Sequence, residues 1–172
     1  MAAIYRSNGE RIVSKEFVTW DEIERLVMEA LLPQLDGPYD AILGITRGGM
    51  VPACLVSERL DIRHVLTAAV KFYTDVEETL PEPIFLQFPG DTLIAGKRVL
   101  IVDDVWDTGH TAYTVRERVR RAGGKPTVAV IHYKPLRSEY PDDQPDYFAQ
   151  ETDAWIVYPW DPDKERLLGA EA

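Results

Sequence analysis

Apolar and polar residues alternate along the first half of the chain with the spacing of helices and strands. Thr19-Trp20-Asp21-Glu22 has the form of a capping box, and apolar residues follow it at helical spacing, so an amphipathic helix is predicted over residues 20–33. Short, mostly apolar runs predict buried strands over residues 39–45 and 64–72. Residues 50–60 predict a second helix with a proline in its first turn.

The second half of the chain repeats this order of strand, polar turn and helix. Residues 98–102 predict the strongest strand, and a polar turn over residues 103–110 follows it. A helix is predicted over residues 111–122, because Gly123-Gly124 then supplies the flexible backbone on which helices commonly end. Residues 127–133 predict another strand, and short strands between Pro- and Asp-rich loops are expected beyond it.

Residues 73–93 lack this clear periodicity. The segment is acidic and contains Pro81 and Pro83, a composition typical of a long loop. Long loops in compact domains are often functional lids, so we expect a mobile lid here, with an edge hairpin as the alternative for part of the segment. The charged residues after Pro162 are expected to form a frayed tail.

The repeated strand, loop and helix order indicates an α/β fold with a mostly parallel central sheet and helices on both faces. No internal repeat or low-complexity linker divides the sequence, so a single domain over residues 1–172 is predicted. In such folds ligands bind at the carboxyl ends of the strands. Two polar loops follow strands in this way, residues 46–49 and 103–110, and we expect them to lie together.

Composition and charge disfavour several classes of function. Of the 172 residues, 45% are hydrophobic and 28% charged, an ordinary balance for a globular protein. No apolar run is long enough to span a bilayer, and the first residues lack the apolar core of a signal peptide, so we expect a cytoplasmic protein with no membrane partner. The net charge of −10 disfavours nucleic-acid binding. The single cysteine, Cys54, is interpreted as a small buried hydrophobic residue.

Residues 99–111 carry the most informative pattern: four apolar residues, two acids, two further residues and then Asp107-Thr108-Gly109-His110-Thr111. Adjacent carboxylates at a strand end can accept hydrogen bonds from ribose hydroxyls, as acidic residues do in dinucleotide sites. The free N–H groups and positive dipole end of the following helix form a phosphate cradle, which Gly109 lets the phosphate approach closely. The alternative interpretation is a helix cap with surface acids after a buried strand.

The whole string resembles the phosphoribosyl pyrophosphate (PRPP) motif of the type I phosphoribosyltransferases. The resemblance extends from about Phe17 to Asp161 and is strongest to the bacterial xanthine-guanine group, which acts on 6-oxopurine bases. The matching pieces also keep their order along the chain: Val18-Thr19-Trp20-Asp21, Arg47-Gly48-Gly49 with Val51-Pro52, Ile62-Arg63-His64-Val65, the PRPP motif, Lys134-Pro135, and Trp155-Ile156 with Pro159-Trp160-Asp161.

The resemblance implies roles for both polar loops. Residues 46–49 match the family's pyrophosphate loop, in which the peptide that corresponds to Arg47-Gly48 is commonly cis. Asp103 and Asp104 would hold the ribose hydroxyls of PRPP, directly or through Mg²⁺, which favours few protein carboxylates together with substrate oxygens and water. The 5-phosphate would be bound by Thr108, Gly109, His110 and Thr111. Small or basic residues are usual in the family at His110, so this residue is assigned a role through its backbone N–H only.

The resemblance also implies how the base is bound, within a base-recognition segment over residues 134–161. Asp107 would lie near N7 of the purine and manage its proton. Lys134 matches the lysine that donates to the exocyclic O6, and because an ammonium group cannot accept a hydrogen bond, it should favour a 6-oxo over a 6-amino purine. Trp155 would stack on the base, and Ile156 would offer its backbone carbonyl to the base edge.

The implied activity is purine salvage, in which the 5-phosphoribosyl group of PRPP passes to guanine, hypoxanthine or xanthine in a homodimer or homotetramer. Val157 stands where the bacterial relatives have an acid, which leaves recognition of the C2 amino group open, and Asp161 is expected near the base or the metal. One alternative is the same fold acting on adenine, orotate or uracil, against which Lys134 and Trp155 argue. The other is a non-catalytic regulator that senses PRPP or nucleotides and binds nucleic acid, against which the acidic charge argues.

Overall fold

The structure is a computed structural model that describes residues 4–5, 11–12, 15–73 and 82–161. Its strands are β1 (Ile4–Tyr5), β2 (Arg11–Ile12), β3 (Lys15–Phe17), β4 (Ala41–Ile45), β5 (Val65–Tyr73), β6 (Glu82–Gln87), β7 (Arg98–Trp106), β8 (Lys125–Tyr133), β9 (Tyr147–Glu151) and β10 (Trp155–Val157). Its α-helices are α1 (Trp20–Arg25), α2 (Met50–Leu60) and α3 (His110–Arg121), and further helical segments of other types lie between them, including a 3-10 turn (Asp91–Leu93). Within the described part of the chain, no helix is long and apolar enough to cross a membrane.

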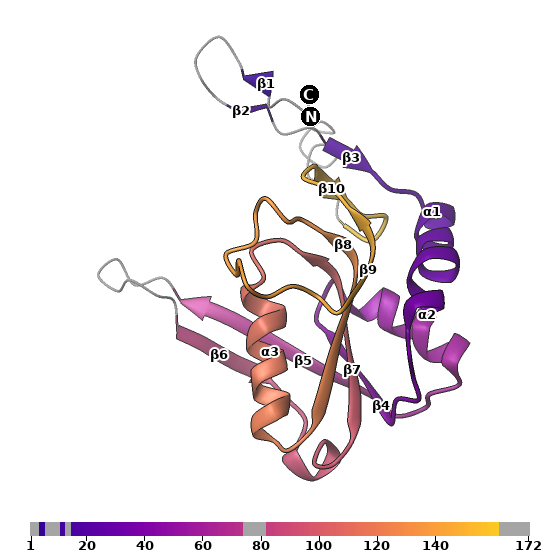
Figure 1. The fold of residues 1–172 in the computed structure, drawn as a ribbon, viewed down its shortest axis with the longest axis vertical. Coiled ribbons are helices and arrows are strands. Elements are labelled where there is room, and N and C mark those ends of the chain that lie inside the picture. Colours follow the sequence, from indigo (N-terminus) through magenta and orange to yellow (C-terminus); the bar gives the residue numbers. More distant parts are fainter. Residues whose placement is uncertain (1–3, 6–10, 13–14, 74–81, 162–172) are drawn as a thin grey trace, which may run out of the picture.

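The central sheet has six strands in the order β6-β5-β4-β7-β8-β9. All neighbouring pairs are parallel except β5 and β6, which pair antiparallel at one edge. The chain moves outward in one direction from β4 and in the other from β7, so the loops after these two central strands meet at the point where the strand order reverses (Figure 1). The predicted α/β class with a mostly parallel sheet is confirmed.

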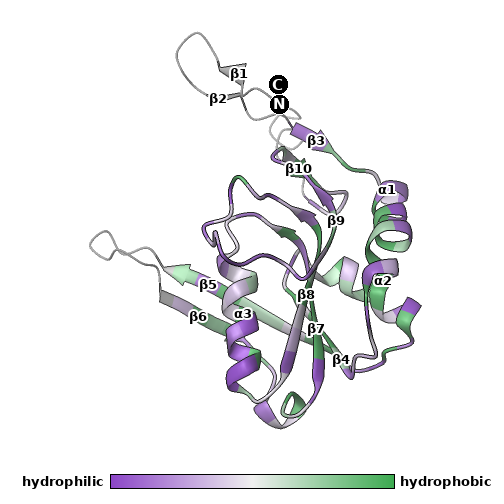
Figure 2. Ribbon diagram, viewed as in Figure 1, coloured by the Kyte–Doolittle hydropathy of each residue, from purple (hydrophilic) through white to green (hydrophobic). Residues whose placement is uncertain are grey.

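Helices cover both faces of the sheet, because successive residues of each central strand point to opposite sides. Ile42 and Leu100 belong to the core beneath α1 and α2, whereas their neighbours Leu43 and Ile101 belong to the core beneath α3. Figure 2 shows the hydrophobic colour concentrated in the strands, while α3 is mostly purple. The sheet therefore supplies two apolar faces, and the loops at its carboxyl edge are left free to carry polar residues.

The first helix begins as the sequence predicts but does not stay α-helical. The side chain of Thr19 accepts a hydrogen bond from the backbone N–H of Glu22 at 3.2 Å, as a capping box requires. After α1 the chain continues as a π-helical segment (Leu26–Leu31) and a 3-10 turn (Leu32–Gln34). The apolar spacing predicts where this helix packs, whereas the change of helical type is not encoded in that spacing.

The interpretation of Cys54 as a buried residue is wrong. Cys54 is exposed on α2, whereas its neighbour Ala53 and the nearby Val56 are buried against the sheet. Residues that adjoin one another on a helix point in different directions, so the face that buries Ala53 turns Cys54 toward solvent.

The segment predicted as a loop over residues 73–93 is partly a strand. β6 pairs antiparallel with β5, with Lys71 opposite Ile84 and Phe72 opposite Pro83, so the alternative of an edge hairpin is confirmed. A proline is tolerated in β6 because this strand lies at the edge of the sheet. Residues 74–81, the centre of the predicted lid, and the tail after residue 161 lie outside the described residues.

The predicted turn over residues 103–110 is also shorter than expected, because β7 continues as a strand to Trp106. Asp103 pairs with Val130 and Trp106 with Tyr133, so the ladder to β8 extends through both acidic residues. Backbone pairing with a neighbouring strand here overrides the low strand propensity of aspartate. The two carboxylates are therefore fixed on a strand rather than on a flexible turn.

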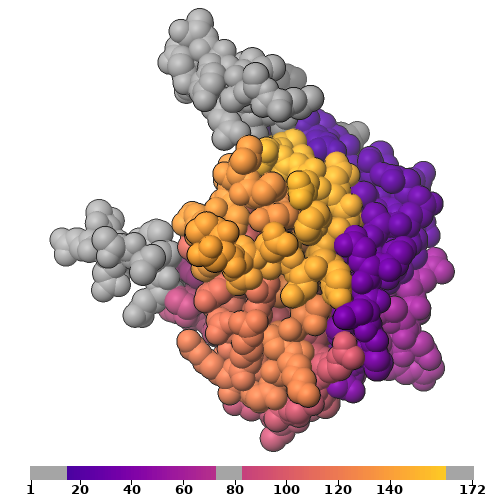
Figure 3. Space-filling view, viewed as in Figure 1, coloured from indigo at the N-terminus to yellow at the C-terminus, as the bar shows by residue number. Residues whose placement is uncertain are grey.

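Residues 155–161 lie beyond the carboxyl edge of the sheet. They are the last part of the base-recognition segment predicted over residues 134–161, and only these seven residues are called the base segment below. β10 pairs parallel with β3, and the backbone N–H of Val18 donates to the carbonyl of Val157 at 3.1 Å. Figure 3 shows the C-terminal part of the chain (yellow) beside the N-terminal part (indigo) on one face of the molecule. The two ends of the described chain thus cooperate to hold the base segment above the sheet.

Candidate active site

The loops after β4 and β7 enclose a cavity of about 300 Å³ at the carboxyl edge of the sheet. Thr46 and Gly48 line it from the first loop, and two acidic residues of β7 line it from below. The remaining polar lining follows these acids along the chain: Asp107, Thr108, Gly109 and Thr111. The structure thus brings together the two polar loops, as the predicted topology requires.

Gly48 and Gly49 allow the first loop to lie directly against β7. A Cβ atom on Gly48 would be 2.0 Å from Oδ2 of Asp104, and one on Gly49 would be 2.4 Å from the carbonyl oxygen of Val102. A Cβ atom at either position would clash unless a neighbour moved, so the Gly-Gly pair permits close packing between the loop and the strand. A non-proline cis peptide lies between Thr46 and Arg47, one residue before the Arg47-Gly48 bond for which it was expected.

The two acids on β7 are in an environment that opposes their charges. Burial, together with the adjacent Asp104 carboxylate, raises the pKa of Asp103 well above its usual range. Burial raises the pKa of Asp104 to about 6, and the charge of Asp161 adds to this effect. Because burial destabilises the charged form of both carboxylates, a cation brought by a ligand would stabilise that charged form.

The turn that begins α3 has the backbone of a phosphate cradle. Gly109 has a positive φ of 91°, which favours glycine, and a Cβ atom there would be 2.5 Å from Nε1 of Trp106. Trp106 is fully buried beneath the turn, and its indole N–H donates to Oγ of Ser138 at 3.1 Å. The free N–H groups at the start of α3 lie beside the cavity that Thr108, Gly109 and Thr111 line.

The ring of His110 is engaged outside the cavity. Its Nδ1 lies 3.0 Å from the hydroxyl of Tyr140, and its Nε2 lies 3.0 Å from Oε2 of Glu139. Because an ionised carboxylate can only accept, Nε2 donates to Glu139. This position for the side chain agrees with the assignment of a backbone role only.

A second cavity, of about 160 Å³, adjoins the first and is lined by the predicted base-binding residues. Lys134 and Trp155 contribute side chains, and the lysine Nζ lies 5.8 Å from the centre of the indole ring. Ile156, Tyr158 and Asp161 complete the lining on the side of the base segment. Trp155 is 54% exposed, so much of this side chain is accessible to a ligand.

Asp107 links the two cavities and is held by two cations. Lys134 donates to its Oδ2 at 3.0 Å, and Nε of Arg137 donates to its Oδ1. The Lys134 side chain is only 5% exposed, so this ion pair is poorly solvated on the lysine side. The lysine ammonium has three N–H donors, so it can donate to a ligand in the second cavity while it remains paired with Asp107.

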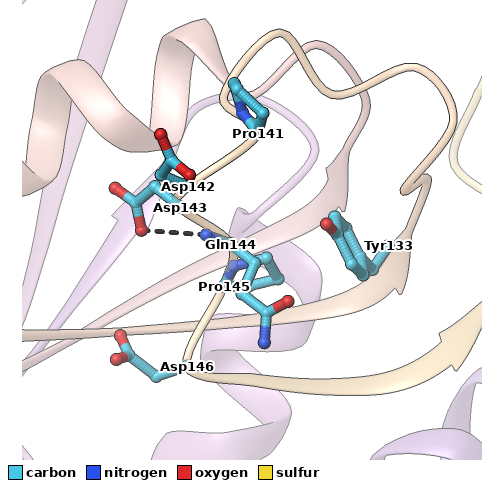
Figure 4. Close-up of a pocket in the computed structure, with 7 residues that line it drawn as sticks. All are labelled: Tyr133, Pro141, Asp142, Asp143, Gln144, Pro145 and Asp146. Atoms are coloured by element: carbon cyan, nitrogen blue, oxygen red, sulfur yellow. Dashed lines mark hydrogen bonds between the residues drawn. The ribbon is translucent and has the colours of Figure 1, made fainter.

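A third cavity, of about 560 Å³, lies apart from both loops and carries no predicted site residue (Figure 4). Three of its lining residues are acidic, yet two of these carboxylates already have protein partners. Asp143 pairs with the buried guanidinium of Arg116 at 2.5 Å, and Asp146 accepts from the backbone N–H of Val128 at 2.7 Å. These contacts fasten residues 141–146 to α3 and β8, and we assign the cavity no chemical role.

The structure separates the predicted residues into those that line the cavities and those that do not. Arg47 is exposed, and neither it nor the ring of His110 lines the cavities that hold the other predicted residues. Sequence reasoning missed Arg137, which contacts Asp107, and Tyr158, which lines the second cavity. Their place near Lys134 and Ile156 in the sequence was the only available signal, and it does not show which neighbours turn inward.

The donor set fits a hard divalent cation that arrives with an anionic substrate. No group of three or more His, Cys, Asp or Glu residues with a geometry for metal binding occurs within residues 15–73 and 82–161. Mg²⁺ commonly takes one or two protein carboxylates and completes its shell with substrate oxygens and water. The adjacent carboxylates of Asp103 and Asp104, which face a cavity next to a phosphate cradle, match that requirement.

The order of strands, the glycine-lined loop and the acidic strand end define a phosphoribosyltransferase fold. The phosphoribosyl transferase domain matches residues 15–165, and the chain belongs to this family.

Individual relatives cover most of the same region. Xanthine-guanine phosphoribosyltransferase of Gluconobacter oxydans (strain 621H) is 36% identical over 149 residues, which span 84% of this chain and 83% of the relative. The enzyme of the same name from Cereibacter sphaeroides (strain ATCC 17025 / ATH 2.4.3) is 40% identical over 151 residues, or 84% and 85% of the two chains. The crystal structure of a purine phosphoribosyltransferase from Pyrococcus horikoshii is similar at a TM-score of 0.75 and 33% identity, over 86% of this chain and 95% of that one.

Proposed function

We propose that the protein transfers the 5-phosphoribosyl group of PRPP to a 6-oxopurine base and releases pyrophosphate. The observation that carries this proposal is the meeting of two chemically different cavities at Asp104, Val105 and Asp107. One cavity combines a phosphate cradle with paired carboxylates, and the other combines a buried lysine with an exposed indole ring. The relatives named xanthine-guanine phosphoribosyltransferase support the same substrate class.

In the proposed complex the first cavity binds PRPP. The N–H groups at the start of α3 and the Thr108 and Thr111 hydroxyls hold the 5-phosphate, while Asp103 and Asp104 hold the ribose hydroxyls. The backbone at Arg47-Gly48 faces the pyrophosphate. Bound Mg²⁺ would be held by Asp103 and Asp104 and would supply neutralisation of the leaving pyrophosphate. Holding both reactants in line then contributes much of the rate enhancement.

The second cavity orients the base and handles its proton. Trp155 stacks on the purine and Ile156 offers its backbone carbonyl, while Lys134 donates to O6 with a second N–H of its ammonium group. The bond from C1 of the ribose to pyrophosphate breaks as the bond from C1 to the purine nitrogen forms, through a transition state with oxocarbenium character. Asp107, which Lys134 and Arg137 hold in place, accepts the proton that leaves the base.

The deciding experiment is an assay of pyrophosphate release from PRPP and Mg²⁺ with six bases in parallel: guanine, hypoxanthine, xanthine, adenine, orotate and uracil. An unpaired buried polar group costs about 1–3 kcal/mol, so adenine, whose 6-amino group faces the lysine donor, should be slower by one to two orders of magnitude. We expect guanine and hypoxanthine to exceed xanthine, because the C2 carbonyl of xanthine would face backbone carbonyls near Ile156. Faster turnover with adenine or a pyrimidine than with every 6-oxopurine would refute the substrate class.

A variant of the lysine tests its role directly. Lys134→Gln should reduce the preference for hypoxanthine over adenine, because the glutamine amide can accept from the 6-amino group as well as donate to O6. Lys125→Gln, at an exposed lysine that begins β8, the strand after which Lys134 follows, is the matched control and should leave the preference unchanged. Equal preference in the wild-type protein and the Lys134 variant would remove the lysine from base selection.

The rival interpretation as a non-catalytic regulator makes a different prediction. A regulator would bind PRPP or nucleotides without releasing pyrophosphate and would retard a nucleic-acid probe at low salt. We propose instead a catalytic protein with no nucleic-acid partner, which assembles as a homodimer or homotetramer. Sedimentation with and without PRPP measures the assembly, and a gel shift separates the two functions.

A further inference from the structure

Three residues that lie far apart in the sequence form a buried chain of hydrogen bonds beneath the active site. The hydroxyl of Tyr158 donates to the backbone carbonyl of Asp104 at 3.0 Å, and Nδ1 of His132 lies 2.8 Å from the same hydroxyl. His132 is fully buried on β8, and Tyr158 is 4% exposed in the base segment. The sequence indicates a structural role for His132 and no chemical role for either residue.

The direction of the protons in this chain follows from what each group can do. A carbonyl can only accept, so the single hydroxyl proton of Tyr158 is committed to Asp104. The tyrosine oxygen must then accept from His132, which places the imidazole proton on Nδ1. Nε2 has no hydrogen-bond partner among the described residues, as expected for the bare nitrogen of that tautomer. Burial, with a contribution from the charge of Lys134, lowers the pKa of His132 to about 4 and keeps the ring neutral.

This chain of hydrogen bonds joins the parts of the protein that form the two cavities. Asp104 lines both cavities from β7, and Tyr158 lines the second from the base segment. The turn that carries Tyr158 is itself closed, because its N–H donates to Oδ2 of Asp161 at 3.1 Å and its carbonyl accepts from the N–H of Asp161 at 3.0 Å. A movement of either cavity wall must therefore break a buried hydrogen bond or move the other wall with it.

We propose that Tyr158, oriented by His132, is a positioning residue that fixes Asp104 and sets the PRPP cavity in register with the base cavity. It acts through the backbone of Asp104 and not on the reacting atoms. This inference rests on the proposed function for its kinetic consequence, but the tautomer and the hydrogen bonds stand independently of the reaction.

The kinetic test removes one oxygen atom. Tyr158→Phe should raise KM for PRPP about three- to tenfold, the range expected for one lost buried hydrogen bond, because Asp104 loses its anchor. KM for the base should change less than about twofold, since β10 remains held by its pairing with β3. A merely structural role would lower the amount of active enzyme and hence apparent kcat, without this split between the two KM values.

The matched control is Tyr39→Phe. The hydroxyl of Tyr39 is also bound to a protein acceptor, Oδ1 of Asp36 at 3.2 Å, and the side chain belongs to the same hydrophobic core but does not line either cavity. It should leave KM for PRPP unchanged. An unchanged KM for PRPP in Tyr158→Phe, or the same rise in Tyr39→Phe, would overturn the proposal.

A spectroscopic test decides the proposal without reference to activity. The sequence has three histidines, so nitrogen-15 spectra of the imidazole rings can be assigned with one substitution at each. His132 should show a protonated Nδ1 and a bare Nε2 at neutral pH, and the Nδ1 signal should shift in Tyr158→Phe. The opposite tautomer, or a signal that does not respond to Tyr158→Phe, would refute the hydrogen-bond chain from His132 through Tyr158 to Asp104, even if the enzyme is active. An inactive wild-type protein with the expected tautomer would refute the proposed function but still support the hydrogen-bond chain.

Discussion

Gly48 lies against the carboxylate of Asp104 so closely that a Cβ atom on the glycine would be 2.0 Å from Oδ2. A Cβ atom on the neighbouring Gly49 would also clash, but with backbone oxygens: those of Val102 at 2.4 Å and Ile45 at 2.7 Å. A carboxylate can rotate away from an added methyl group, whereas paired strands cannot. Two adjacent glycines in one loop therefore have different reasons to be glycine.

This difference predicts separate effects for two alanine substitutions. Gly48→Ala should displace the Asp104 carboxylate and lower kcat/KM for PRPP by about 10²-fold, the effect of a misplacement of about 1 Å, with little change in stability. Gly49→Ala should instead lower the free energy of unfolding by about 1–3 kcal/mol through overpacking. Urea denaturation and steady-state kinetics on both variants separate the two. Gly90→Ala, where an added Cβ meets no atom closer than 4.0 Å, is the control for both measurements.

Asp107→Asn should lower kcat by about 10²–10⁴-fold, the usual contribution of a side chain that manages a proton. PRPP affinity should stay close to that of the wild-type protein, because the phosphate cradle and the acidic pair are untouched. Asp142→Asn removes an exposed carboxylate outside both cavities and serves as the control. Near-normal turnover in purified Asp107→Asn would show that Asp107 is not the proton acceptor.

Asp104→Asn should stabilise the free protein while it weakens PRPP binding. The pKa of Asp104 is raised to about 6, so the folded state disfavours the charged form, and that penalty is complete above pH 6 and disappears as the pH falls toward the ordinary value near 4. At about pH 8 the variant should gain roughly 1–3 kcal/mol in the free energy of unfolding. Mg²⁺ with PRPP should raise the Tm of the wild-type protein more than that of the variant. A variant that is less stable at high pH, or equally stabilised by the ligands, would contradict the assignment.

His132 predicts a pH dependence of the opposite sign. Its pKa is lowered to about 4 in the folded protein, below the ordinary value near 6.5, so the unfolded chain binds more protons between these limits. Stability from this residue is complete above about pH 6.5 and is lost toward pH 4, by at most roughly 3 kcal/mol. Because Asp104 changes in the other direction over part of this range, the measurement is the difference in unfolding free energy between the wild-type protein and His132→Gln at each pH. A difference that does not vary with pH would show that His132 is not held neutral.

Much of the fold could be predicted because strand and helix periods were strong where the core is. The runs that became β4, β7 and β8 are buried on both faces, so their apolar character was continuous. The edge strand β6 was harder, since a half-exposed strand with a proline resembles a loop until its partner β5 is known. The extension of β7 to Trp106 likewise depends on pairing with β8 rather than on its own sequence.

The candidate site divides in the same way. The residues around the phosphate cradle and the pair of acids could be predicted from contiguous motifs, because residues that are close in the sequence there are also close in space. The contacts of Asp107 with Arg137 and of Asp104 with Tyr158 span 30 and 54 residues, and no local pattern indicates them. The engagement of His110 by Glu139 and Tyr140 arises from a loop whose path the sequence does not specify.

The two cavities draw on different stretches of the chain and share only Asp104, Val105 and Asp107 among their lining residues. Under the proposed function, the remaining groups that face PRPP lie between Ile45 and Ala112, while the remaining groups that face the base lie between Lys134 and Asp161. A lineage that inherits this arrangement can diversify its choice of base by substitution, insertion or exchange of one late stretch of the gene. The residues proposed to carry out the transfer lie earlier in the sequence and would not be altered by such changes.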